Sequence, residues 1–179
     1  MSKTVRPVES VWNYPRPPRL EPTSSRLRVI WESKDGGEKR TVAETTKGYR
    51  VLETSHPPTY YFPPSSIDMS LLRPSTARRT MCEWKGQATY HDLVLPSDNS
   101  TIAARGRAWS YPEPVPEFKS IKDYLCFYAS PQSKVGTWRC YVDDDEVTAQ
   151  EGDFYGSWVT PEITGGERGF KGGPGTMGW

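Results

Sequence analysis

GQATYHDLVLPSDNSTIAARGRAWSY, residues 86–111, carries the clearest β-hairpin pattern of the chain. Between Ala88 and Leu95 successive side chains alternate in character, as they do in a strand whose two faces differ. The run 96–99, Pro-Ser-Asp-Asn, supplies turn residues, and 102–111 has the composition of a partner strand. This segment therefore predicts two antiparallel strands.

Similar short strands are predicted on both sides of this hairpin. Residues 27–31 alternate, and Asp-Gly-Gly at 35–37 suits a hairpin turn because glycine adopts positive φ readily. Further β-prone runs lie at 41–43, 49–53, 60–62, 125–129 and 137–142, and short helices are expected at 67–72 and 120–123. Regularly spaced short strands predict a mainly β fold, a single compact antiparallel domain that is barrel-like, sandwich-like or tent-like with one or two short helices.

Composition divides the chain into three parts. Residues 1–25 hold five prolines around Trp12 and Tyr14, which disfavours a helix and favours an extended arm whose rings pack on the body. Residues 26–150 form the β-rich core of the prediction. Residues 151–179 are dense in glycine and aromatic residues and show no period. Because flexible Gly-rich linkers lack rings, we expect this tail to pack irregularly on the core.

Charge and hydropathy exclude several classes of protein. The 179 residues include 23 Lys or Arg and 22 Asp or Glu, so the basic excess typical of dedicated nucleic-acid binders is absent. No apolar run approaches the ~20 residues of a membrane span, and the N-terminal residues do not resemble a secretory signal. We therefore expect a cytoplasmic protein, with the nucleus not excluded, that binds neither nucleic acid nor membranes.

The cysteines and histidines do not form a metal-binding pattern. Cys82, Cys126 and Cys140 include no CxxC pair, which favours reduced thiols in a reducing compartment. His56 and His91 are the only histidines and show no paired spacing. A structural zinc site needs about four ligands, commonly with a close pair, so neither a metal nor a cofactor is expected.

One group of polar and aromatic residues has the composition of a ligand pocket. A carboxylate, an ammonium and several rings lie near predicted strand ends, at Glu53, Tyr60, Tyr61, Trp84, Lys85 and Tyr90. Such residues can wall a pocket for a small polar or anionic ligand. They equally suit an aromatic core with a surface Glu–Lys pair. In the pocket hypothesis Lys85 contacts an anion and Glu53 accepts a hydrogen bond, with further binding residues expected at Trp109, Trp158 and Lys171.

An enzymatic hypothesis uses the same region. Cys82 lies near Lys85, and a neighbouring cation lowers a thiol pKa, so Cys82 is a candidate nucleophile. Lys85 is a candidate acid/base or Schiff-base residue, and Glu53 completes the catalytic set. The glycines of 165–175 do not form a phosphate loop, because the required GxxxxGK[ST] spacing is missing. Asp143 and Asp145 are too close to Gly136 for a metal-dependent nucleotidyl-transfer motif, and we expect them in a solvated turn.

Several long segments resemble the domain-of-unknown-function 427 family. They are RVLETSHPPTYYFPPSSID (50–68), CEWKGQATYHDL (82–93), AWSYPEP (108–114) and DYLCFYA (123–129), with VESVWNYPRPP (8–18) and the tail. The resemblance implies a compact, mostly β domain and little chemistry, because the family is uncharacterised. Some members carry an automatic nucleotidyltransferase label, which the missing carboxylate motif does not support here.

The shared family positions overlap the candidate pocket. They map onto Glu53, Pro57, Pro58, Tyr60, Tyr61, Pro63, Asp68, Cys82, Lys85, Gly86, Tyr90, Trp109 and Tyr111. Two residues depart from the family pattern: His91 replaces an aromatic residue, which could alter a pocket wall, and Ser157 replaces a glycine. Three hypotheses follow: a small-ligand-binding module, an enzyme, and an interaction scaffold that presents the Pro-rich arm. The oligomeric state stays open.

Overall fold

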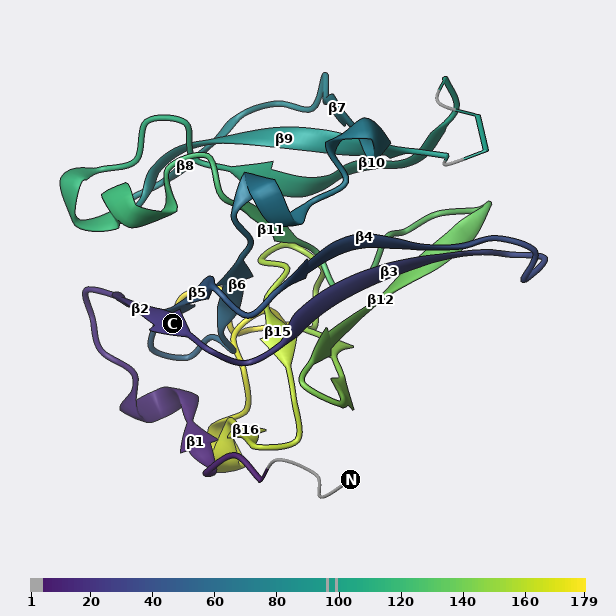
Figure 1. Ribbon diagram of the computed structural model, residues 1–179. Helices are drawn as coiled ribbons and strands as arrows, with labels where there is room; N and C mark the ends of the chain where they lie inside the picture. Colours follow the sequence, from purple (N-terminus) through teal and green to yellow (C-terminus); the bar gives the residue numbers. More distant parts are fainter. Residues whose placement is uncertain (1–4, 96, 99) are drawn as a thin grey trace.

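Two packed sheets form the body of the protein in the computed structural model, which describes residues 5–95, 97–98 and 100–179 (Figure 1). The first sheet has the strand order β13 (Asp145–Glu146), β12 (Gly136–Val142), β3 (Leu27–Ser33) and β4 (Lys39–Thr45). The second has the order β11 (Leu125–Phe127), β10 (Ile102–Ser110), β9 (Gly86–Val94) and β7 (Leu72–Pro74), with β8 (Thr80–Cys82) also paired to β9.

Three smaller sheets complete the strands. One has the order β2 (Arg19–Thr23), β5 (Gly48–Leu52) and β6 (Thr59–Tyr61). The parallel pair β1 (Glu9–Ser10) and β16 (Ile163–Thr164) joins the N-terminal arm to the tail, and β14 (Thr148–Ala149) pairs with β15 (Trp158–Val159). The prediction of a mainly β, antiparallel fold is confirmed. The barrel alternative is wrong, because each sheet is an open row of strands with two edges.

Helical structure is limited to short 3₁₀ turns in the described part of the chain. These are η1 (Val11–Asn13), η2 (Pro64–Ser66), η3 (Met69–Leu71), η4 (Pro116–Ile121) and η5 (Gly166–Arg168). Near the helix predicted at 67–72, the Asp68 side chain caps η3 by accepting a hydrogen bond from Ser70 N at 3.2 Å. Pro116 begins η4, which places the second predicted helix a few residues earlier than expected.

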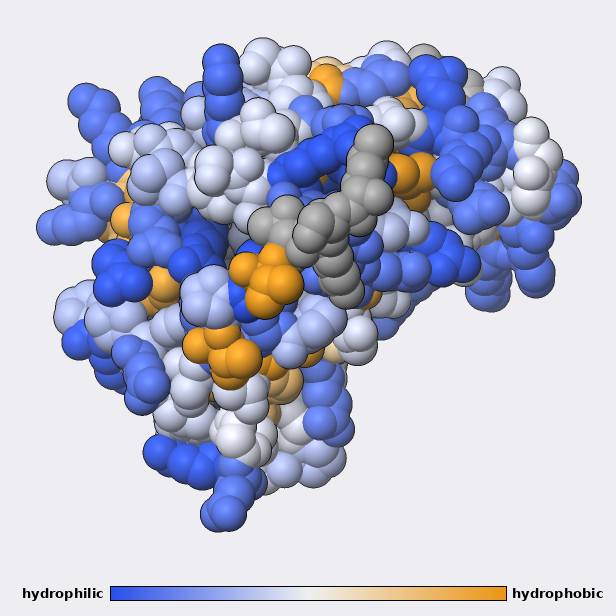
Figure 2. Space-filling view, turned by 60° about the horizontal axis from the view of Figure 1, so that its bottom comes forward, coloured by the Kyte–Doolittle hydropathy of each residue, from blue (hydrophilic) through white to orange (hydrophobic). Residues whose placement is uncertain are grey.

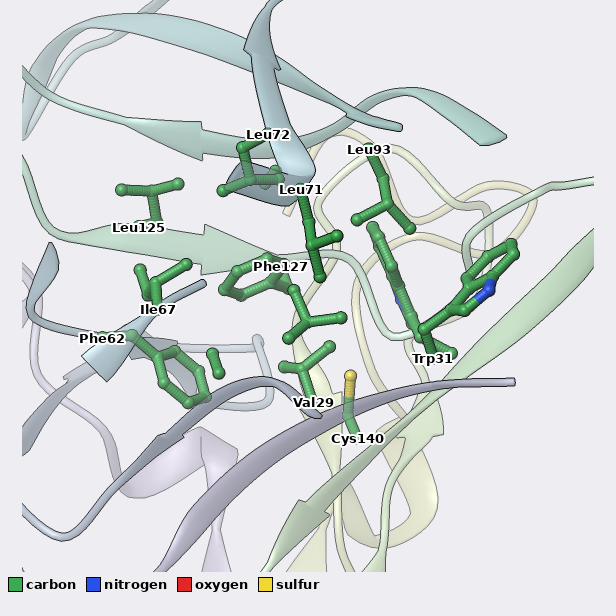
Figure 3. Close-up of a cluster of buried hydrophobic side chains, with 14 of the residues drawn as sticks. Val29, Trp31, Phe62, Ile67, Leu71, Leu72, Leu93, Leu125, Phe127 and Cys140 are labelled. Atoms are coloured by element: carbon green, nitrogen blue, oxygen red, sulfur yellow. The ribbon is translucent and has the colours of Figure 1, made fainter. Parts of the chain in front are cut away.

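The main hydrophobic core fills the space between the two large sheets (Figure 3). Trp31 of β3, Leu93 of β9 and Phe127 of β11 have no exposed surface. Phe127 packs edge-on against Phe62 and Trp138, with ring centroids 5.4 and 5.8 Å apart. Rings therefore provide much of the burial that aliphatic residues supply in most cores.

The N-terminal arm and the tail both lie on this body. Val11 and Tyr14 of the arm are buried, and Trp12 Nε1 donates a hydrogen bond to Gly169 O at 3.0 Å. The guanidinium of Arg168 stacks over the Trp12 ring at 3.4 Å. These contacts fasten residues from opposite ends of the sequence to each other.

The acidic turn after β12 differs from the sequence interpretation. The guanidinium of Arg6 forms ion pairs with Asp143 and Asp145, each at 2.7 Å, and with Glu162. The interpretation of a solvated turn was therefore wrong, because the arm supplies a cation from 136 or more residues away. The turn predicted at 96–99 lies partly outside the described residues.

The outer surface is mainly hydrophilic in the view of Figure 2, where hydrophobic residues form small groups separated by polar side chains. This agrees with the low mean hydropathy of −0.72. Among the described residues, no helix is long and apolar enough to cross a membrane.

Candidate functional site

A second cluster of rings lies on the opposite face of the β9–β10–β11 sheet. Alternation along the strands creates it: Tyr90 of β9 faces Trp109 of β10, which in turn faces Cys126 of β11. Residues directly opposite each other on paired strands point to the same face of a sheet. The cluster also receives Val51 from β5 and Tyr61 from β6.

The side chains of this cluster leave a cavity of about 350 Å³ unfilled beside them. The volume lies within the range of roughly 300–1,000 Å³ that is typical of small-molecule sites. One wall comes from the second sheet and from the β2–β5–β6 sheet, and residues 153–157 with Lys171 supply another. Eight of the ten candidate catalytic and binding residues line it: Glu53, Tyr61, Cys82, Trp84, Lys85, Tyr90, Trp109 and Lys171.

Lys85 is held inside this cavity by the tight turn between β8 and β9. Gly86 permits the turn because its φ is +105°, a value that side chains with a Cβ rarely adopt. Val115 N donates a hydrogen bond to Lys85 O at 3.1 Å and fixes the backbone. The residue is only 7% exposed. Its ammonium therefore lies within the protein and not in bulk solvent.

The Lys85 ammonium has no acidic partner among the described residues. It lies 5.9 Å from the centre of the Tyr111 ring and 6.0 Å from that of Phe118. The Glu–Lys pair of the alternative interpretation, a plain aromatic core, is not formed between Glu53 and Lys85. Glu53 instead lies near His56, with Oε1 4.0 Å from Nε2. Burying a cation without a counter-charge is unfavourable, and ring faces offset only part of that cost.

His56 is a cavity residue whose pKa is strongly perturbed. Burial, together with the positive charges of Lys171 and Lys85, lowers its pKa to about 4. The imidazole is therefore neutral at neutral pH. Its ring packs edge-on against Tyr155 of the tail, with centroids 4.5 Å apart.

Two further polar groups are enclosed without a hydrogen-bond partner in the described structure. They are the Tyr61 hydroxyl and Trp84 Nε1, both on residues that line the cavity. Burial raises the pKa of the Tyr61 phenol well above its usual value, so the hydroxyl keeps its proton. Both groups are therefore hydrogen-bond donors at neutral pH, and buried donors normally have partners.

The tail wall of the cavity is anchored by buried contacts. Arg107 is 8% exposed and forms an ion pair with Asp153, whose Oδ1 lies 2.5 Å from Nη2. The Tyr128 hydroxyl donates to Phe154 O at 3.1 Å. Gly156 has a φ of +70°, and a Cβ there would lie 2.7 Å from the Tyr128 ring. A glycine at 156 thus lets the tail approach the sheet closely.

Lys171 lies at the more open part of this wall. Its Nζ donates a hydrogen bond to Trp179 O at 2.8 Å and lies 5.6 Å from the centre of the Tyr155 ring. The main chain of Lys171 is also fixed, because its N–H donates to Ser55 O at 2.9 Å. The cavity therefore has a second ammonium beside the buried one of Lys85.

Two expected binding residues lie elsewhere. Tyr60 is 2% exposed and Trp158 is fully buried, and both belong to the main core, with ring centroids 5.3 Å apart. Consecutive strand residues point to opposite faces, so Tyr60 and Tyr61 cannot share one wall. His91 also lies outside the cavity lining, and its Nε2 is 3.1 Å from Ser110 Oγ.

Cys82 is the one cysteine of the described residues that lines the cavity. Cys126 and Cys140 are buried, and burial raises the pKa of both thiols. None of the three forms a disulfide. Within the part of the chain that the structure describes, no three His, Cys, Asp or Glu side chains gather as metal ligands.

The family model described as a domain of unknown function (DUF427) matches residues 19–141. The chain belongs to this family. The match includes the strand wall of the cavity, from Val51 to Tyr128, and ends before the tail wall. No curated protein matches the chain.

Sequence reasoning missed the residues that connect these two walls. The sequence pattern assigns no binding role to His56, and it does not mark Asp153, Tyr155 or Gln150. The placement of Arg107 was also unexpected, since a solvated pair of Arg105 and Arg107 is the usual interpretation of such a sequence. For this wall, the sequence signal was the glycine-rich and aromatic composition of residues 151–179, which predicted packing on the core without specifying its partners.

Proposed function

We propose that this protein binds a small organic anion in the cavity between the β-sheet wall and the tail. The observation that carries the proposal is the Lys85 ammonium, 7% exposed and without a carboxylate partner among the described residues. An anionic ligand would supply the missing counter-charge, and a buried charge is stable only when it is paired.

The rest of the cavity fits an anion attached to a planar or apolar body. Rings of Trp84, Tyr90 and Trp109 border it, and aromatic faces pack well against planar ligands. Lys171 adds positive charge at the open side, and Asp153 is already neutralised by Arg107. Glu53 is an acceptor for a hydroxyl or amino group of the ligand.

Benzoate, phenyl phosphate and the uncharged benzamide are suitable probes. We expect benzoate or phenyl phosphate to raise the melting temperature with increasing concentration, and benzamide to do so much less. Lys85→Met should remove the advantage of the charged probes. Lys34→Met, at an exposed lysine away from the cavity, should leave it intact. Equal responses to all three probes in wild type and Lys85→Met would refute anion binding at this site.

The enzymatic alternative has one observation in its favour, which is that Cys82 and Lys85 line the same cavity. An activated thiol reacts with iodoacetamide well below pH 8, whereas an ordinary one reacts mainly above it. Labelling of Cys82 against pH, with peptide mapping, therefore tests its role as nucleophile. Reaction only at alkaline pH removes Cys82 from the catalytic hypothesis. The interaction-scaffold hypothesis has no such support, because Val11, Tyr14 and Pro18 of the arm are buried.

A further inference from the structure

The strand wall and the tail wall meet in a buried chain of hydrogen bonds. Gln150 precedes the tail and is 2% exposed. Its Nε2 donates to Lys171 O at 2.5 Å and lies 3.2 Å from His56 Nδ1. Gln150 thus connects His56, which follows β5, with a main-chain oxygen of the tail.

The direction of these bonds follows from the carbonyl at one end. A main-chain oxygen only accepts hydrogen bonds, so the amide nitrogen of Gln150, and not its oxygen, must face Lys171 O. The second N–H of the same nitrogen then points at His56 Nδ1. The opposite amide orientation would bring two oxygens to 2.5 Å from each other. Nδ1 is therefore an acceptor in this arrangement.

The proton of the neutral imidazole must then be on the other nitrogen. His56 Nε2 makes no hydrogen bond to any described residue, and the closest carboxylate oxygen, Glu53 Oε1, is 4.0 Å away. The His56 side chain lines the cavity together with Lys85. A hydrogen-bond donor of fixed tautomer is thus available in the cavity that also holds the unpaired ammonium.

We infer that His56 is a ligand-binding residue that donates its Nε2–H to the anionic group, and that Gln150 fixes the tautomer required for this. The inference rests on the proposed function and deepens it. Lys85 supplies charge, and His56 supplies a directed hydrogen bond to a second oxygen. The cavity therefore prefers a carboxylate or another oxyanion with at least two acceptor oxygens over a single-atom anion such as chloride.

The tautomer can be measured without any ligand. Nitrogen-15 NMR of the imidazole distinguishes a protonated ring nitrogen from an unprotonated one. We expect His56 Nδ1 to be unprotonated and Nε2 protonated at pH 7. Gln150→Leu removes the donor that faces Nδ1, so the share of the tautomer with a protonated Nδ1 should rise. Gln87→Leu makes the same change at an exposed position of β9 and should change nothing. A protonated Nδ1 in the wild type overturns the inference.

Binding of benzoate tests the role of the donor. His56→Leu should weaken benzoate binding by about tenfold or more, as expected for a lost hydrogen bond to a charged group. His56→Gln places an amide N–H near the position of Nε2 and should recover most of the affinity. Gln150→Leu should weaken binding, whereas Gln87→Leu should not.

The outcomes separate the two proposals. If benzoate binding depends on Lys85 but His56→Leu binds as tightly as wild type, the role of His56 is wrong and the anion site stands. If His56→Gln is as weak as His56→Leu, His56 acts through packing and not as a donor. If wild type binds neither benzoate nor phenyl phosphate, the proposed function fails, and this inference fails with it.

Discussion

The two faces of the β9–β10–β11 sheet are both covered by aromatic residues, yet one is filled and the other is hollow. On the filled face Trp138 Nε1 and Trp158 Nε1 each donate to a main-chain oxygen at 2.7 Å, although Trp31 Nε1 lacks a partner. On the hollow face a lysine is enclosed without a counter-charge. Aromatic content alone does not distinguish a core from a pocket, whereas an unpaired buried charge does.

A large-to-small substitution on each face tests this comparison most strongly. Phe127→Ala should lower the free energy of unfolding by about 3–5 kcal/mol, because Phe127 has no exposed surface and the core closes around it. Trp84→Ala, at a half-buried residue of the hollow face, should cost less than about 2 kcal/mol. Urea denaturation measures both, and equal losses would show that the second face is packed as tightly as the first.

The pH dependence of stability tests the enclosure of His56. Its pKa is lowered to about 4 in the folded protein, against about 6.5 in an unfolded chain. The unfolded state therefore binds more protons between these values, so stability is fully present above pH 6.5 and is lost as the pH falls toward 4. At about 1.4 kcal/mol for each pKa unit, the loss should be about 2–4 kcal/mol.

A variant without the imidazole isolates this contribution. Other charged groups also lie near His56: the ammonium groups of Lys171 and Lys85 and the carboxylate of Glu53. The pH dependence of the wild type alone therefore does not isolate His56. The difference in unfolding free energy between wild type and His56→Gln should narrow as the pH falls from 7 to 4. A difference that stays constant over this range would show that His56 is accessible to water and protonates freely.

The Arg107–Asp153 ion pair anchors the tail wall. It should contribute less to the free energy of unfolding than Phe127 in the core or the burial of His56. Asp153→Asn removes the negative charge that faces the buried Arg107 guanidinium, and should cost about 1–3 kcal/mol because the carboxylate side is partly exposed. Limited proteolysis should then cut within 151–157 faster than in the wild type. An unchanged cleavage rate would mean that Tyr128 and Gly156 alone hold this segment against the sheet.

Strand positions were predictable because their signals are local. Period-two alternation marked β3 and β9, and Asp35-Gly36-Gly37 marked the β3–β4 turn, where Gly36 has a φ of +70°. The same alternation could have assigned Tyr60 to the core and Tyr61 to the cavity. That error came from grouping residues by chemical type without applying the strand period to neighbours in sequence.

The tail wall was not predictable, because its contacts join residues far apart in the chain. Arg107 meets Asp153 across 46 positions, and Gln150 meets His56 across 94. No local pattern in 151–179 specifies these pairs, and short strands such as β16 gain their pairing from the arm. The presence of Lys85 and Glu53 in one cavity was expected, and the approach of His56 to Glu53 is local because the two residues are three positions apart. The contact of His56 with Gln150 is the one that depends on long-range packing.

The smallest expected effect has the opposite sign to the others. Lys85→Met keeps the length of the side chain and removes a buried charge without a partner, so it should raise the free energy of unfolding by about 1–2 kcal/mol. Lys34→Met, at an exposed lysine, should change it little. A residue that lowers stability is expected to serve another role, which in the proposed function is the binding of an anion. If Lys85→Met destabilises the protein, the contacts with Tyr111 and Phe118 make Lys85 part of the packing, and the two faces of the sheet differ less than the cavity indicates.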